Sequence, residues 1–352
     1  MCVHSMRQAA LVAGVSSLLC LPAQKAVAQQ APAPAPEKVA VPEGGLTLGG
    51  HRFIVPASFP TSFVATYFGI RLGALVHTDP DVPTEAGQFS LSTLGGAQTL
   101  ELGVKVTDWL GFFAKARLAV LVGSNVPGLI YSGATYEGTG EGGLIFRILR
   151  IDTSGTQVSF RVSGSYSSGL STSVFPLLVQ EAALTVRTVL QGQLRQLIRT
   201  PISGWDAQGN AVAAQALGPY FSLQGLAGGG VSGARIEPFD VAAGARGSSA
   251  MTDGEFNAAV AIEADASAAG VPVAGLFEYS LARQPAVLEF LPLNGSGFVH
   301  TLSLGAYYSG KPNLQLGLVG AVDLGLPRFS TSLGPSGSPH TELGQIVVLY
   351  IW

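Results

Sequence analysis

Cysteine is scarce in this chain, which contains only two in 352 residues, Cys2 and Cys20. Both lie in an N-terminal segment that begins with a short basic region, continues as the apolar stretch Ala9–Pro22 and ends in the small residues Ala26-Val27-Ala28. This pattern predicts a secretory signal peptide over residues 1–28. The chain that remains has no thiol, which excludes a disulfide framework and cysteine catalysis.

Charge and long hydrophobic runs are also scarce. Only 12% of the residues are charged and 47% are hydrophobic, and the formal net charge of −3 offers no basic footprint for nucleic acid. The longest run without charge, 207–234, is broken by Gly218-Pro219 and by three glycines at 228–230, so no spanning helix is predicted. Because only helices and closed barrels satisfy the backbone inside a bilayer, an apolar chain without such a helix points to a barrel.

Twelve segments of alternating character follow residue 60, and each has about the length of a tilted membrane strand. They are Ser62–Val76, Ala97–Thr107, Leu110–Ser124, Glu141–Ile151, Gly155–Ser167, Asn210–Leu217, Pro219–Gly230, Glu255–Ala264, Val271–Arg283, Gly297–Ser309, Asn313–Gly325 and Glu342–Trp352. Short and long connections are expected to alternate between them, as in barrels with short periplasmic turns and long extracellular loops. We therefore predict an all-β fold, a transmembrane antiparallel β-barrel.

The last segment carries the one specific motif. Its alternate residues Gly344, Ile346, Val348, Tyr350 and Trp352 lie on one apolar face. The segment resembles the closing strand of Gram-negative outer-membrane β-barrels, in which a terminal aromatic residue serves as a signal for assembly. The resemblance implies an outer-membrane location, with membrane lipid, lipopolysaccharide and the barrel-assembly machinery as partners. Self-association into a homo-oligomer is left open.

Three parts of the chain are expected. Residues 1–28 are the signal peptide, 29–60 are a periplasmic Pro/Ala-rich linker with a stiff Ala-Pro repeat at 31–36, and 61–352 are the barrel. The third long loop contains a predicted helix, Phe175–Arg199, with apolar residues at helical spacing. It resembles the constriction loop of porins, and could fold into the lumen, cover the mouth or rest on the outer leaflet. In the lumen or at the mouth it would present Arg187, Arg195 and Arg199 to solute.

The alternation also predicts which charged side chains face the lumen, since a charge at the lipid-facing midplane is costly. Basic residues occupy one arc and acidic residues the other, which resembles the transverse field of general porins. The basic set is Lys105, Lys115, Arg117, Arg147 and Arg161, and the acidic set is Glu255, Glu263, Glu278 and Asp323. The alternative is that these charges only keep the interior wet.

No enzyme motif accompanies this pattern. H-E-x-x-H, Walker and G-x-S-x-G sequences are absent. An outer-membrane lipid hydrolase is disfavoured, because Leu302 stands where a phospholipase pattern would place a serine two residues after His300. The first loop carries hard potential ligands, but a solvated loop is the favoured interpretation; these are His77, Asp79, Asp81 and Glu85. We predict no enzyme activity, no cofactor and no metal.

The predicted function is a channel or passive transporter for small solutes, with a loop helix restricting the mouth. Two alternatives remain. Val347, Leu349 and Ile351 face inward on the last strand and would suit a channel for apolar compounds. A non-conducting barrel could instead act as an anchor or in adhesion or assembly.

Overall fold

The computed structural model describes residues 46–84, 87–174, 198–240, 245–284, 293–294, 297–326, 328–331 and 334–352. They lie in one compact unit, 42–352. The predicted signal peptide lies outside the described residues, as do positions 175–197 of the predicted loop helix, including Arg187 and Arg195.

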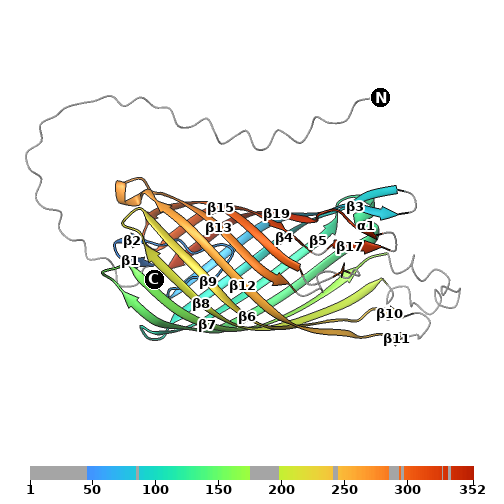
Figure 1. The fold of residues 1–352 in the computed structure, drawn as a ribbon, viewed down its shortest axis with the longest axis horizontal. Coiled ribbons are helices and arrows are strands. Elements are labelled where there is room, and N and C mark those ends of the chain that lie inside the picture. Colours follow the sequence, from blue (N-terminus) through green and yellow to red (C-terminus); the bar gives the residue numbers. More distant parts are fainter. Residues whose placement is uncertain are drawn as a thin grey trace, which may run out of the picture. The chain divides into compact units, whose positions relative to one another are not determined.

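Twelve antiparallel strands close into a single barrel (Figure 1). The strands are β3 Tyr67–Thr84, β4 Gly87–Lys105, β5 Leu110–Gly123, β6 Ala134–Ile151, β7 Thr156–Thr172, β8 Arg199–Ala216, β9 Phe221–Ile236, β12 Ser249–Asp265, β13 Val273–Gln284, β15 Gly297–Lys311, β16 Leu314–Leu324 and β19 His340–Ile351. Each pairs with its neighbour in the chain, and β19 pairs with β3 to close the ring. The predicted fold class is confirmed, and every predicted segment overlaps one strand.

Most strands continue further than predicted at the end that carries the long connections. The first connection was expected to be a loop over residues 77–96, but β3 runs to Thr84 and β4 starts at Gly87, so only two residues join them. The expected alternation of short and long connections therefore fails at this first position. His77 and Asp79 consequently lie on a strand. No group of three or more metal-ligating side chains occurs within the described ranges.

Several smaller elements lie in the connections at the ends of the barrel. They are β10 Phe239–Asp240, β11 Ala245–Arg246, the 3-10 helix η2 Ala266–Ala269, β14 Leu293–Asn294, β17 Arg328–Thr331 and β18 Gly334–Pro335. The single α-helix of the described residues is α1, Val126–Tyr131, between β5 and β6. Asn125 caps it, because its side-chain oxygen accepts a hydrogen bond of 2.7 Å from the Gly128 N–H. No helix in the described ranges is both long and apolar enough to cross a bilayer.

The outer face of the barrel is apolar and uncovered. Outward residues such as Leu118, Leu304 and Leu318 are each about two-thirds exposed, at 65%, 66% and 65%. In a protein surrounded by water such a continuous apolar belt would be unfavourable, whereas in a bilayer it faces acyl chains. Aromatic residues gather at the end with the short turns, where Tyr350 and Trp352 lie 5.6 Å apart between ring centroids. This placement is typical of a membrane interface.

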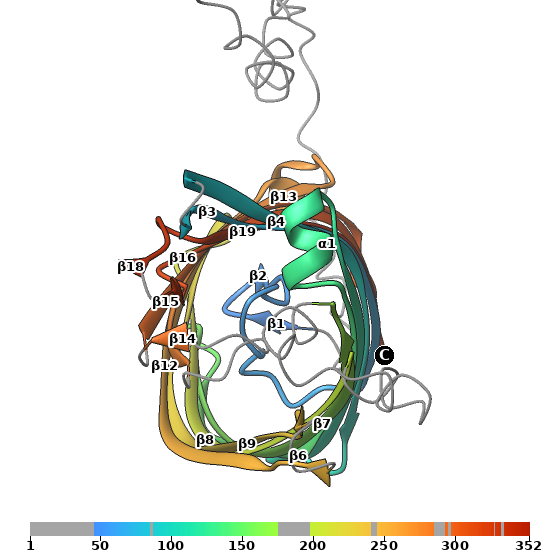
Figure 2. The ribbon, with the colours of Figure 1, turned by 90° about the vertical axis from the view of Figure 1, so that its right-hand side faces the viewer.

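Residues 46–66 lie inside the ring of strands, at the end with the short turns, and we call them the plug (Figure 2). The plug begins with a hairpin of β1, Thr47–Leu48, and β2, His51–Arg52. Gly49 and Gly50 both have positive φ, 59° and 80°, which the tight turn requires and glycine adopts without strain. The described part of the expected linker, 46–60, is thus packed within the barrel and is not a free tether.

Candidate functional site

Side chains of the barrel wall hold the plug backbone. Both carboxylate oxygens of Glu263 on β12 accept the Ile54 N–H at 3.0 Å, and Gln224 on β9 donates to the Ile54 carbonyl at 2.7 Å. Gln315 on β16 binds the plug backbone on both sides of Ile54. Its side-chain oxygen accepts from the Val55 N–H at 3.1 Å, and its amide nitrogen donates to the Phe53 carbonyl at 2.8 Å. These side chains satisfy backbone groups that would otherwise be buried without partners.

A second set of contacts fixes the middle of the plug. Glu278 on β13 accepts the N–H groups of Ala57 and Ser58, each at 2.7 Å, and also the Ser58 hydroxyl. Arg71 on β3 donates to the carbonyls of Pro56 and Ala57, at 3.0 and 2.8 Å. Glu278 is 1% exposed and Arg71 is 8% exposed, so the contacts are shielded from water. Charged acceptors and donors of this kind form the stronger class of hydrogen bonds.

The end of the plug is held from the opposite wall. Gln157 and Ser159 on β7 both donate to the Ser62 carbonyl, at 2.6 and 2.5 Å. The wall contacts therefore come from six strands distributed around the barrel, β3, β7, β9, β12, β13 and β16. The plug is bound on all sides.

Apolar packing completes the plug. Phe53 and Phe63 lie 5.0 Å apart between ring centroids. They share a buried cluster with Leu349 and Ile351, and Val347 lies in the adjoining cluster with Ile54 and Phe59. The three inward apolar residues of the last strand thus pack against the plug and do not form an apolar path through the described structure.

One histidine is buried between the plug and the wall. His51 is 0% exposed; its Nε2 lies 3.4 Å from a carboxylate oxygen of Glu263 and its Nδ1 lies 3.1 Å from the Pro219 carbonyl. Burial lowers the pKa of His51, but the Glu263 carboxylate beside it, helped by the Pro219 carbonyl and Asp265, raises the pKa by more than burial lowers it. The net pKa of His51 is raised above its ordinary value of 6.5.

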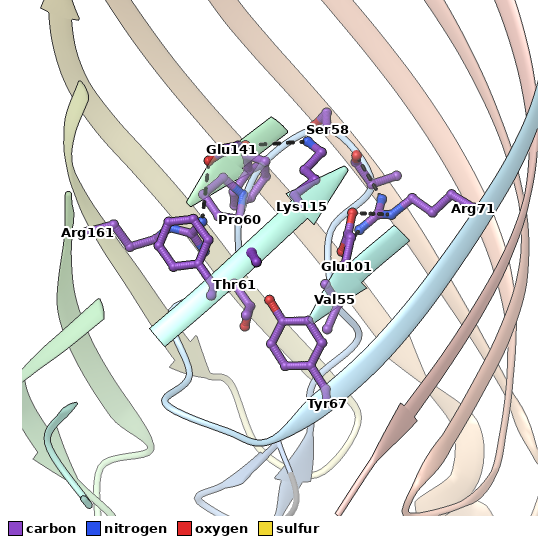
Figure 3. A pocket seen from close by; sticks show the side chains of 14 residues that line it. Val55, Ser58, Pro60, Thr61, Tyr67, Arg71, Glu101, Lys115, Glu141 and Arg161 are labelled. Atoms are coloured by element: carbon purple, nitrogen blue, oxygen red, sulfur yellow. Dashed lines mark hydrogen bonds and ion pairs between the residues drawn. The ribbon is translucent and has the colours of Figure 1, made fainter. Parts of the chain in front are cut away.

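Above the plug the lumen contains three adjoining cavities of about 100, 230 and 180 Å³, all bordered by Glu141. Plug residues 58–60 border the first two of them. Figure 3 shows the first, where Arg71 and Glu101 form one ion pair at 2.9 Å and Glu141 lies between Lys115, at 3.9 Å, and Arg161, at 3.8 Å. The plug is therefore the floor of a charged, polar chamber.

Acidic side chains lie among the basic residues that the sequence predicts to face the lumen. Glu101 and Glu141 lie among Arg71, Lys115 and Arg161 and pair with them, so the charges are interleaved there and not separated into two opposed rows. Arg161 is further held over the ring of Phe113, with its Cζ 3.5 Å from the ring centroid.

The remaining predicted residues have different surroundings. Lys105 pairs with Asp108 at 2.6 Å in the turn after β4, and Arg147 lies opposite Ser159 near the same end. Glu255 borders the lumen on β12, while Asp323 accepts a hydrogen bond of 2.6 Å from Thr301. Arg199 begins β8 opposite Thr172, so it belongs to a strand and not to the predicted helix.

Sequence reasoning placed Glu263 and Glu278 in the lumen but did not foresee that they bind the plug, and it missed most of the other residues that hold it. Arg71, Gln157, Gln224 and Gln315 were not among the predicted site residues, although each falls on the inward phase of its strand. Gln315 gave the clearest signal, as a single amide in the apolar segment Leu314–Val319. Such isolated amides indicate a partner in the interior, because a buried amide needs hydrogen bonds.

The closed sheet, the apolar exterior and the polar interior define a membrane-spanning β-barrel of the outer-membrane type. No family model and no curated protein matches the sequence.

Solved structures with a similar fold include three outer-membrane proteins. A FadL homologue from Pseudomonas aeruginosa has a TM-score of 0.49 and 11% identity, covering 87% of this chain and 96% of that one. An outer membrane channel from Pseudomonas putida F1 has a TM-score of 0.47 and 10% identity, with coverages of 85% and 100%. The translocator domain of the autotransporter NalP from Neisseria meningitidis has a TM-score of 0.46 and 10% identity, with coverages of 81% and 88%.

Proposed function

We propose that the chain is a transport channel for small polar solutes in the outer membrane of a Gram-negative bacterium, and that the plug closes its periplasmic end. The observation that supports this proposal is how the plug is attached. Within the described part of the chain, its short strands β1 and β2 pair with each other and form a sheet separate from the barrel. The plug can therefore leave without breaking any strand pairing of the wall.

The polar contacts of the plug can be exchanged for water, whereas its apolar contacts hold it in place. Its backbone contacts are hydrogen bonds to wall side chains, and a hydrogen bond contributes only about 0.5–1.5 kcal/mol net, or roughly 1.5–3 kcal/mol with a charged partner, because water replaces the lost contact. Once the plug moves, water would hydrate the glutamates, glutamines and arginine that had held it. The apolar contacts of Phe53 and Ile54 with the wall resist departure, so they keep the channel closed for most of the time.

The charged chamber above the plug would select the solute. Lys115, Arg117 and Glu141 border one cavity of this chamber, and polar side chains of β7 and β8 border the rest of it. The predicted loop helix, with Arg187 and Arg195, is proposed to restrict the outer mouth. Partners beyond lipid and solute, namely lipopolysaccharide, the assembly machinery and further copies of the chain, remain proposals.

A reversible tether tests the gating role. The described residues contain no cysteine, so the introduced thiols would have no native thiol among these residues to compete with them. Ser58→Cys and Glu278→Cys place thiols on two side chains that contact each other. Conductance of the refolded chain 29–352 in a planar bilayer is measured before cross-linking with a short disulfide-containing reagent, after cross-linking and after reduction.

We expect discrete conductance steps before cross-linking, silence afterwards and recovery on reduction. The control pairs Ser58→Cys with Glu342→Cys on the outward phase of β19, which the reagent cannot join to the plug. If the conductance does not change on cross-linking, the plug is excluded as the gate. The filled lumen also favours a second candidate, a non-conducting barrel with an anchoring role; a correctly folded double variant that stays silent in every state would support it.

A further inference from the structure

Four polar side chains form a cluster on the lumen wall away from the plug contacts. Gln208 and Asn210 come from β8, and Glu255 and Asn257 from β12. Gln208 Nε2 donates to a carboxylate oxygen of Glu255 at 2.8 Å, and Asn257 Nδ2 donates to Gln208 Oε1 at 3.2 Å. Asn210 Nδ2 is 3.5 Å from the same Gln208 oxygen.

The cluster bridges two strands that are not neighbours, because the strand between them lacks side chains at this level. On β9, Gly228 pairs with both Asn210 and Asn257, and Gly230 pairs with both Gln208 and Glu255. A Cβ added at Gly228 would lie 2.0 Å from Asn210 Oδ1, so the amide occupies the space of the missing side chain. The glycines thus let β8 and β12 meet across β9 and make a shallow cradle.

Two hydrogen-bond acceptors of the cradle have no donor within the described structure. The amide nitrogens of Gln208, Asn210 and Asn257 are directed within the cluster, while Asn210 Oδ1 and Asn257 Oδ1 accept no hydrogen bond. Asn210 is only 4% exposed and borders the cavity of about 230 Å³ together with Gln208 and Asn257. A buried acceptor without a donor indicates a missing partner that donates hydrogen bonds.

The charge of the cradle narrows the choice of partner. Glu255 forms no ion pair among the described residues, and its contact in the cluster is the neutral Gln208. Asp253, the inward-facing residue two positions before Glu255 on β12, is instead paired with Arg283 at 3.2 Å. Among the cations that border the cavities next to the cluster, Arg161 and Lys115 pair with Glu141, and Arg117 borders the cavity on the far side of Gln208. The cradle therefore presents a carboxylate without an ion pair and two amide oxygens without a donor within the described structure.

We propose that this cradle binds the primary ammonium group of a small amine solute, a specificity that rests on the proposed transport function. An ammonium has three donors and no acceptor, which matches Glu255, Asn210 Oδ1 and Asn257 Oδ1. A hydroxyl group brings one donor and two lone pairs, so it would leave acceptors unmatched and the carboxylate charge unpaired. The two asparagines border the same cavity as plug residues 58–60, so an ammonium held by them would face the plug.

Equilibrium binding to the full chain 29–352 in detergent tests the proposal without requiring conduction. Isothermal titration calorimetry compares diaminobutane with butanediol, which have the same length and differ only in ammonium against hydroxyl groups. We expect diaminobutane to bind and butanediol to bind at least tenfold more weakly, about the effect of one charge-assisted contact at a half-buried site. Equal binding of the two compounds would overturn the assignment.

Matched variants locate the site. Glu255→Gln should weaken diaminobutane about tenfold, whereas Glu342→Gln, the same substitution on the outward phase of β19, should leave binding unchanged. Asn257→Asp adds a carboxylate without changing shape and should tighten binding, an effect that misfolding does not produce.

Unchanged affinity in both Glu255→Gln and Asn257→Asp would refute the cradle. A barrel that conducts without binding diaminobutane refutes only this inference, and one that binds without ever conducting refutes only the transport function.

Discussion

Removing the carboxylate of Glu278 should open the channel. This side chain accepts two plug N–H groups at 2.7 Å and the Ser58 hydroxyl, and it is 1% exposed. Glu278→Ala would leave both N–H groups unpaired while the plug stays in place, whereas water would satisfy them once the plug leaves. The substitution therefore destabilises the closed state relative to the open state.

The size of the effect follows from these contacts. Each buried donor left without a partner costs about 1–3 kcal/mol, so two cost about 2–6 kcal/mol. Taking about 3 kcal/mol shifts the ratio of open to closed channels roughly 100-fold, since each 1.4 kcal/mol is tenfold. A channel that is rarely open in the native chain would then be open for much of the recording.

Single-channel recording in planar bilayers measures this ratio directly. Glu342→Ala removes a carboxylate from the outward phase of β19 and should leave the open probability unchanged. A heat-dependent shift in gel mobility verifies that each variant is a folded barrel. If Glu278→Ala is folded and yet opens no more often than the native chain, the plug is not held closed by this contact and the gating argument fails.

Three further predictions concern pH, selectivity and stability. The raised pKa of His51 means that its protonated form stabilises the closed plug below pH 6.5, its ordinary value, and that this contribution disappears as the pH rises through the raised pKa. Native channels should open more often across that rise, and His51→Gln should remove the pH dependence; a persistent dependence would exclude His51. Arg117 borders the chamber without an ion pair among the described residues, so Arg117→Glu should shift the reversal potential in a salt gradient toward cation selectivity, and an unchanged potential would remove Arg117 from the pathway. Gly228→Ala places a Cβ 2.0 Å from Asn210 Oδ1 and 2.4 Å from a backbone oxygen, so it should lower the temperature of the gel-mobility shift, whereas Gly344→Ala meets nothing within 4 Å and should not.

The strands were predictable because their cause is local. In β4 and β5 the outward positions are apolar and the inward positions carry Glu101, Lys115 and Arg117, and this alternation alone assigns each strand its two faces. The ends of the strands were less predictable. Beyond the bilayer neither face needs to be apolar, so the continuation of β3 to Thr84 leaves no alternation in the sequence.

The plug shows the limit of the same reasoning. The sequence after the glycine turn, His51 to Val55, does not show where this segment lies, because several groups that bind it come from strands far along the chain, such as Glu263 and Gln315. Individual inward polar residues could be recognised from the sequence. Some of them face water and others face a peptide backbone, and this difference depends on where the N-terminal segment lies.

The sequence by itself determined the barrel, the inner and outer faces of its strands and the absence of cysteine chemistry, since these follow from residue type and a period of two. The tertiary structure alone decided that residues 46–66 fill the lumen, that Glu101 and Glu141 interrupt the basic arc, and that Asn210 and Asn257 meet across Gly228. The physical reason is distance along the chain. Periodicity is a property of neighbouring residues, whereas hydrogen bonds and ion pairs across a lumen join residues that only closure of the barrel brings together.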